Sequence, residues 1–250
     1  MYPRTLILAT ALLVGGTINS SSGGSTDDLP ETNYYEIVVP QGRMVIRLYD
    51  ETPAHRDNFK KLVAEGFYDG TTLHRVIEGF MIQGGDPNSK DDDPYNDGMG
   101  DPGYTLPAEF VRALFHKRGA LAAARTGDHM NPKRRSSGSQ FYIVHGTTFD
   151  DATLDIVARQ IQMTLRDNSF NFSEEMRAVY RSQGGAPNLD GQYTVFGEVV
   201  EGLDVLDAVA AVPTPGKLRQ RTNPQITDRP LDDIALTIRP LPEYAAKALN

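Results

Sequence analysis

Short runs of alternating apolar and polar residues recur along most of the chain. In residues 44–48 (MVIRL) and 234–238 (IALTI) every second side chain is apolar, so one face of each run should point inward, as in a half-buried β-strand. Turn residues separate seven such runs, at residues 34–39, 43–49, 71–77, 80–84, 139–145, 193–200 and 233–239. This pattern predicts a mainly β protein with antiparallel strands.

Two helices are expected among these strands. The first should begin at Pro53, where proline suits the first helical position, and end at Gly66. The second should run from about Gly202 to Ala211, with apolar residues on one stripe. Seven or eight strands with two helices predict a closed eight-stranded antiparallel β-barrel that the two α-helices cap at its ends.

Two segments interrupt the strand pattern. Residues 87–107 are rich in Pro, Gly and Asp and are expected to form a loop. Residues 150–187 differ, because Leu154, Val157, Ile161 and Leu165 recur at helical spacing. We interpret residues 150–187 as an extra helical insertion between two strands.

The N-terminal residues have the order typical of a secretory signal peptide. Arg4 precedes the apolar run of residues 6–14, and Gly, Ser and Thr then dominate. We therefore predict a signal peptide at residues 1–25 and a linker at residues 26–33, and an exported protein that is periplasmic or secreted. The apolar run has about half the length that a membrane-spanning helix needs, so no stable membrane span is expected.

Composition narrows the function further. The 250 residues carry a formal net charge of −8, which argues against nucleic acid as a partner because a phosphate-binding surface needs an excess of Lys and Arg. The chain has no cysteine, which excludes disulfides, a thiolate nucleophile and a lipid-bearing cysteine. Absent cysteines also favour a bacterial envelope over a disulfide-rich extracellular setting.

Local motifs for other chemistry have little support. Residues 98–103 fit G-x-G-x-x-G, the dinucleotide-binding fingerprint, but they follow an acidic loop instead of a strand, and Pro102 prevents a helix from starting there. The acidic residues at 91–93, 97 and 101 lack the ligand spacing of a calcium loop. The five histidines contain no H-E-x-x-H motif. No metal site and no cofactor are predicted.

Three sequence blocks remain. They are LHRVIEGFMIQGGD at residues 73–86, GSQFYIV at residues 138–144 and YTVFGEVVEGLDVLD at residues 193–207. In order and in strand context, the three blocks resemble the cyclophilin family of peptidyl-prolyl cis–trans isomerases. The resemblance implies a cyclophilin-like domain at residues 34–240, interrupted by the helical insertion and followed by a C-terminal tail at residues 241–250.

Without the resemblance, the same residues have ordinary structural explanations. An arginine such as Arg75 beside apolar strand residues commonly extends its guanidinium to solvent or pairs with an acid. Phe80, Met81, Tyr142 and Leu189 could simply belong to a hydrophobic core. The residues alone therefore support only a β-barrel.

The resemblance implies a groove on the outer face of the barrel that binds an extended X–Pro segment. Its members would be Arg75, Phe80, Met81, Gln83, Gln140, Tyr142 and Leu189, with Ala124, Arg125 and Thr126 as the edge that binds the substrate backbone. The expected partners are proline-containing peptides and unfolded exported proteins, and the expected activity is acceleration of X–Pro rotation during folding.

Amide chemistry gives Arg75 its expected role. Rotation about an X–Pro bond has a barrier of about 18–20 kcal/mol because twisting destroys amide resonance. In the twisted state the prolyl nitrogen becomes a better hydrogen-bond acceptor, so a fixed donor aimed at it stabilises that state over either planar isomer. Arg75 is the predicted catalytic donor, and the apolar residues would hold the proline ring.

Departures from the family pattern leave an alternative open. The chain has no Trp, although many eukaryotic members have one beside the proline pocket, and Asn188 precedes Leu189 there; weak cyclosporin binding is therefore expected. Tyr193 replaces a common pocket histidine, and Arg125 replaces an asparagine of the backbone-binding edge. These changes motivate the alternative of a non-catalytic cyclophilin-like peptide-binding module or chaperone.

Overall fold

The computed structural model describes residues 32–244. The predicted signal peptide, most of the predicted linker and residues 245–250 of the predicted tail lie outside this range. The strands are β1 Tyr34–Val39, β2 Gly42–Leu48, β3 Arg75–Ile77, β4 Met81–Gly84, β5 Thr105–Leu106, β6 Ala120–Ala123, β7 Ser136–Ser137, β8 Phe141–Val144, β9 Val195–Glu201 and β10 Thr237–Pro240. The helices are α1 Pro53–Ala64, α2 Asp151–Leu165, α3 Glu174–Ser182 and α4 Leu203–Ala210, with 3-10 helices η1 Pro87–Lys90, η2 Pro187–Leu189 and η3 Pro224–Ile226.

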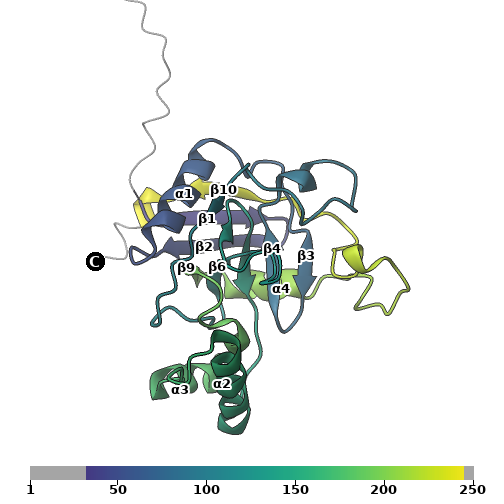
Figure 1. Ribbon diagram of the computed structural model, residues 1–250. Helices are drawn as coiled ribbons and strands as arrows, with labels where there is room; N and C mark the ends of the chain where they lie inside the picture. The colour runs from purple at the N-terminus through teal and green to yellow at the C-terminus, as the bar shows by residue number, and fades with distance from the viewer. Residues whose placement is uncertain (1–31, 245–250) are drawn as a thin grey trace, which may run out of the picture.

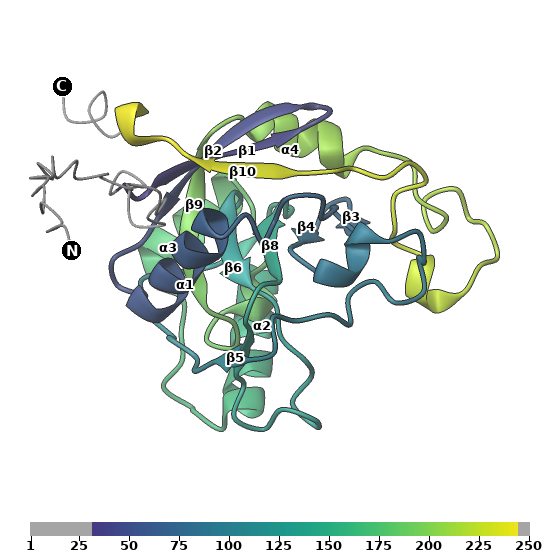
Figure 2. The same cartoon turned by 90° about the horizontal axis from the view of Figure 1, so that it is seen from above.

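Eight of the strands form one antiparallel sheet, which confirms the mainly β prediction. Their order is β10-β1-β2-β9-β6-β8-β4-β3, and β5 pairs only with β7. Figures 1 and 2 show the sheet curving around the core, with α1 on one side and α4 on the other. In this order β8 lies between β6 and β4, and strands β3, β4 and β8 contribute Arg75, Met81, Gln83 and Tyr142 to the site described below.

The predicted closed barrel is not confirmed, and the sheet is a half-barrel. Its edge strands β3 and β10 do not pair as a ladder. The segments that precede them meet in a single bridge between Thr72 and Ala235, where the Leu73 N–H donates to the Ile234 carbonyl at 2.9 Å. The predicted strand at residues 71–77 is thus a strand only from Arg75 onward.

The main hydrophobic core lies inside the curved sheet and under the two helices. Phe59 of α1 is buried against Tyr35, Tyr68 and Phe141 in edge and tilted ring contacts. Leu206 of α4 is also buried in this core. Burial of their apolar stripes explains why the residues at helical spacing form α1 and α4 here, since a short helix gains most of its stability from tertiary packing.

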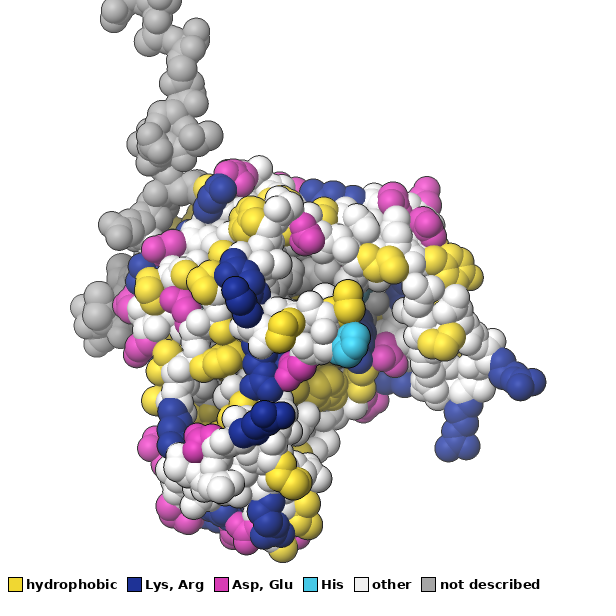
Figure 3. Space-filling view, viewed as in Figure 1, with side chains coloured by type: hydrophobic (Ala, Val, Ile, Leu, Met, Phe, Trp, Pro, Cys, Tyr) yellow, Lys and Arg dark blue, Asp and Glu magenta, His cyan; other side chains and the backbone are white. Residues whose placement is uncertain are grey.

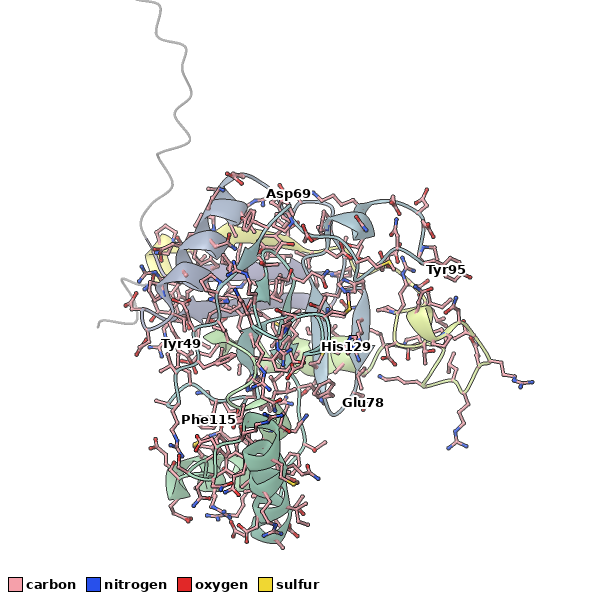
Figure 4. The ribbon with its side chains drawn as sticks, viewed as in Figure 1. Tyr49, Asp69, Glu78, Tyr95, Phe115 and His129 are labelled. Atoms are coloured by element: carbon pink, nitrogen blue, oxygen red, sulfur yellow. The ribbon has the colours of Figure 1, made fainter. Side chains whose placement is uncertain are left out.

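Helices α2 and α3 occupy the segment expected to be a helical insertion and project below the sheet (Figure 1). Each begins with a side-chain cap, because the Asp150 carboxylate accepts from the Thr153 N–H and the Ser173 hydroxyl from the Met176 N–H. Their apolar faces form a second, smaller core that includes Leu154, Ile161 and Tyr180. Phe115 joins this core where the helices meet the sheet (Figure 4).

Candidate active site

A hollow of about 150 Å³ lies on the outer face of the sheet, beside the helical segment. We call it the central hollow, and it is lined by Arg75, Phe80, Met81, Gln83, Ala124, Arg125, Tyr142, Leu189 and Tyr193. All of these are residues that the resemblance marks as substrate contacts. The other two marked residues, Thr126 and Gln140, line a neighbouring hollow of about 160 Å³, the edge hollow, which shares Gln83, Ala124 and Arg125 with the central one.

Strand register explains why residues so far apart in sequence meet here. Arg75 of β3 lies opposite Gln83 of β4, and Gln83 lies opposite Tyr142 of β8. Tyr142 in turn lies opposite Ala122 of β6. Residues directly opposite one another on neighbouring strands share a face of the sheet, so the register places Arg75, Gln83 and Tyr142 on one face.

The Arg75 guanidinium is available to a ligand. Its side chain is 44% exposed, and its Nε donates to Asp228 Oδ2 at 3.3 Å. Among residues 32–244, no other hydrogen bond to this guanidinium is formed. The Val76 N–H fixes the position of Asp228 by donating to its backbone carbonyl at 2.8 Å. Pairing with an acid, the ordinary explanation for such an arginine, therefore does occur, but it leaves both terminal nitrogens free.

Gln83, opposite Arg75 on β4, is connected through Gln140 to a glycine-rich loop. Gln83 Nε2 donates to Gln140 Oε1 at 3.0 Å, and Gln140 Nε2 donates to the carbonyls of Gly98 and Gly100 at 3.0 and 2.8 Å. The buried Asp86 carboxylate accepts from the N–H groups of the same two glycines. A Cβ on Gly100 would overlap this carboxylate, so the loop of the G-x-G-x-x-G match serves here to fix Gln140.

The backbone of Arg125 is unpaired among the described residues and lies next to the central hollow. Ala124 uses its N–H and carbonyl in bonds to Gln140 and Ser137, whereas Arg125 has no backbone hydrogen bond within residues 32–244. The Arg125 side chain lies over the Tyr193 ring, 4.4 Å from its centroid, and its Nε donates to the Gln192 carbonyl at 2.9 Å. Arg125 lies just past the end of β6, an interior strand of the sheet, and its free N–H and carbonyl can pair with an extended peptide.

A buried polar network holds the Tyr142 side of the hollow. His116 Nε2 lies 2.9 Å from the Tyr142 hydroxyl, and His116 Nδ1 lies 2.7 Å from Asp190 Oδ1. The Tyr180 hydroxyl of α3 donates to Asp190 Oδ2 at 2.6 Å. Burial raises the pKa of Tyr142 and of Tyr180 well above the ordinary value for tyrosine, so both hydroxyls stay protonated. Through Asp190, the helical segment is thus joined to the hollow.

Sequence reasoning missed His116, Asp190, Asp86 and Asp228. His116 and Asp190 are separated by 74 positions, and Arg75 and Asp228 by 153, so no local motif connects them. The only local signal was the turn chemistry of Asp86, which is followed by proline and accepts from the Asn88 N–H.

Comparison of the chain with models of protein families identifies its family. The family model for cyclophilin type peptidyl-prolyl cis-trans isomerases matches residues 34–230. The chain belongs to this family. The match includes every residue of the central hollow.

Relatives and solved structures agree with the assignment. A peptidyl-prolyl cis-trans isomerase of Staphylococcus saprophyticus is 34% identical to this cyclophilin over 200 residues, covering 78% of this chain and 85% of the relative. A counterpart in Staphylococcus aureus is 32% identical over the same shares. A crystal structure of a Cryptosporidium parvum cyclophilin has the same fold, with a TM-score of 0.57, 23% identity and coverage of 85% of this chain and all of that one.

Acidic and basic side chains both occur on the face that Figure 3 shows, and several Lys and Arg side chains lie in a column down its middle. Within residues 32–244, no group of three or more His, Asp or Glu side chains could hold a metal ion. No helix in that same range is long and apolar enough to cross a membrane.

Proposed function

We propose that this cyclophilin accelerates X–Pro rotation in exported proteins at the central hollow, with Arg75 as the catalytic donor. The observation that carries the proposal is the free pair of terminal nitrogens on Arg75 beside a hollow of about 150 Å³ that Phe80, Met81 and Leu189 line on its apolar side. A cavity of roughly this size holds a benzene ring, so the pyrrolidine ring of proline fits. Phe80, Met81, Tyr142 and Leu189 would surround that ring.

The required rate enhancement is within reach of these groups. Uncatalysed X–Pro isomerisation takes tens to hundreds of seconds, and reaching milliseconds requires about five powers of ten, or roughly 7 kcal/mol. A charged donor that meets its acceptor only in the transition state supplies about 3–4 kcal/mol. Fixing the ring and excluding water around the twisted bond account for the remainder.

The neighbours of Arg75 orient it without consuming its donors. Asp228 accepts from Nε only, so both terminal nitrogens of this hollow-lining residue remain unpaired among the described residues. Gln83 faces Arg75 across the β3–β4 pair and is itself held by Gln140. We assign Gln83 to orienting the guanidinium and the substrate carbonyl, and Gln140 to positioning Gln83.

The residue before proline would bind as an added strand. The unpaired N–H and carbonyl of Arg125 match the hydrogen-bonding groups of an extended backbone. This pairing would place the preceding residue along Ala124, Arg125 and Thr126, next to the edge hollow, and would leave the proline ring in the central hollow.

The exported setting rests on the predicted signal peptide at residues 1–25, and it makes unfolded exported proteins the expected clients. Weak cyclosporin binding follows from Asn188, which is exposed next to Leu189 where many eukaryotic members have a Trp. Fractionation of cells that produce the full chain tests the export proposal, and retention of the unprocessed chain in the cytoplasm would contradict it.

Exchange NMR on an Ala-Ala-Pro-Ala-Ala peptide tests the activity. We expect catalytic amounts of protein to raise cis–trans exchange by several powers of ten over buffer, and Phe80→Ala to lower kcat/KM by about 10- to 100-fold through loss of the ring contact. Leu218→Ala, at a half-exposed apolar residue outside the hollow, should change nothing. Binding without enhanced exchange would instead support the non-catalytic module.

A further inference from the structure

A third hollow, of about 220 Å³, lies between the sheet and the helical segment. We call it the helical hollow. Its walls are mainly apolar, with Leu165, Phe170 and Met176 on the helical side and Phe110, Leu114 and Phe115 on the other. Phe110 is 43% exposed, so the hollow opens to solvent and its apolar lining is not closed off by the chain itself.

The helical hollow adjoins the central hollow at one residue. Tyr193 lines both of them, and its ring is fixed by the Arg125 guanidinium above it and by an edge contact with Tyr142, with centroids 6.0 Å apart. A peptide that leaves the central hollow past Tyr193 therefore meets the apolar lining directly.

The outer wall of the helical hollow is preformed. Arg112 Nη2 donates to the carbonyls of Ser169 and Asn171 at 3.2 and 3.3 Å, and its guanidinium lies 5.7 Å from the centroid of the Phe170 ring. The Asp167 carboxylate accepts from the N–H and hydroxyl of Ser169. The polar groups at the mouth are thus already paired, and binding here requires little ordering of the wall.

We propose that the helical hollow binds one large apolar side chain of the client, aromatic or branched aliphatic, from a residue shortly after the proline. The inference rests on the proposed function of the central hollow. The volume of the helical hollow, about 220 Å³, is sufficient for an aromatic ring, since an apolar cavity of about 150 Å³ binds benzene.

The direction follows from which walls the hollows share. The edge hollow meets the central one along Gln83, Ala124 and Arg125, where the residue before proline pairs with the Arg125 backbone. The helical hollow meets it at Tyr193, which does not line the edge hollow, so we assign the chain that follows the proline to the helical hollow. An extended chain advances about 3.3–3.6 Å per residue, so the first three positions after proline cover about 10 Å.

Peptides that differ in one residue test this site. The reference is Ala-Ala-Pro-Ala-Ala-Ala, and three others carry Phe at the first, second or third position after proline; a fifth carries Phe two residues before it. We expect at least one position after proline to lower KM by about tenfold relative to the reference. The same ratio is read from Kd values by fluorescence anisotropy, which needs no turnover.

Two variants change the helical hollow at residues that do not line the central hollow. Phe110→Ala removes part of its lining and Val111→Trp fills it, and both should abolish the Phe preference while leaving turnover of the reference peptide unchanged. Tyr95→Ala is the matched control, because Tyr95 is a half-exposed aromatic residue on a loop far from Phe115 and the helical segment (Figure 4). Tyr95→Ala should keep the preference.

The outcomes separate this inference from the proposed function. Equal KM and Kd values for all peptides, or a preference that survives Phe110→Ala and Val111→Trp, would overturn the helical hollow as a binding site even when the reference peptide is isomerised well. Failure to isomerise the reference peptide would contradict the proposed function, and the Kd ratios would still decide whether the hollow binds Phe. A preference only for Phe before proline would also overturn the inference.

Discussion

Arg75 and Tyr142 face the same central hollow from walls that are built in opposite ways. The Arg75 wall is open: its guanidinium is half-exposed, and the carboxylate that pairs with it, Asp228, is 36% exposed. The Tyr142 wall is closed: its hydroxyl meets His116, which is 1% exposed, and Asp190, which is 4% exposed, completes the network.

The difference separates a reactive group from a fixed surface. A donor that stabilises a twisted amide must keep unpaired N–H groups in the resting protein, and that requires solvent contact or a substrate. A wall that defines the shape of the proline site must instead keep one conformation, and a fully paired buried network provides this rigidity. The helical segment contributes only to the closed Tyr142 wall, through the Tyr180 hydroxyl that donates to Asp190.

Removing the buried carboxylate should have the largest effect on stability. Asp190→Ala leaves the His116 backbone N–H, the His116 ring and the Tyr180 hydroxyl without their partner, and each buried polar group left unsatisfied costs about 1–3 kcal/mol, so the three together should cost at least about 3 kcal/mol. We expect this loss in the free energy of unfolding from urea denaturation. A loss below about 1 kcal/mol, the size typical of exposed pairs, would show that the two walls do not differ as described.

Acid should destabilise the protein through buried histidines. His74, next to Arg75 in sequence, is buried with both ring nitrogens unpaired among the described residues, and burial lowers its pKa to about 4. The unfolded chain binds a proton near pH 6.5 whereas the folded one does not, so stability falls as pH drops from 6.5 toward 4. Burial also lowers the pKa of His55 and His145, with the same sign.

The His74 contribution is measurable by difference. Between pH 7 and 4.5 it should reach about 2–3 kcal/mol, and His74→Gln should reduce the fall in unfolding free energy by that amount. Equal falls for the two proteins would mean that His74 is not held neutral by the fold.

Removing the exposed carboxylate should have the smallest effect on stability. Asp228→Ala breaks a solvent-exposed contact of 3.3 Å with Arg75, and such pairs contribute about 0–1 kcal/mol. We expect unfolding free energy to change by less than 1 kcal/mol on that basis, in the same urea experiment as Asp190→Ala. A loss comparable to that of Asp190→Ala would remove the contrast between the walls.

Much of the site could be predicted from sequence because one hairpin carries it. Arg75, Phe80, Met81 and Gln83 lie within a single matched block, and pairing of β3 with β4 fixes the common face of Arg75, Met81 and Gln83. The strand β6 was not among the predicted runs, since Ala120–Ala123 is buried at every position and shows no alternation. Its neighbours Ala124 and Arg125 were located only through the resemblance.

The rest depends on contacts that no local pattern records. Asp228 reaches Arg75 from a loop 153 residues away, and the His116–Asp190 pair connects the sheet to the end of the helical segment. Whether the barrel closes likewise depends on how many residues of the two edge strands pair with each other. The alternation of apolar and polar residues along each strand does not specify that number. Strand periodicity therefore predicts the sheet, while tertiary contacts determine its edges and the walls of the hollow.

The central claim is that the Arg75 guanidinium stabilises the twisted X–Pro bond. The most direct test is kcat/KM for Ala-Ala-Pro-Ala-Ala, measured by exchange NMR on the original protein, on Arg75→Ala and on the control Arg43→Ala. Arg43 is a suitable control because it is 43% exposed, pairs with Glu201 at a distance of 2.9 Å and does not line the central hollow. We predict a loss of about 100- to 1000-fold for Arg75→Ala with an unchanged unfolding free energy, and no loss for Arg43→Ala. Full turnover by Arg75→Ala would contradict the account.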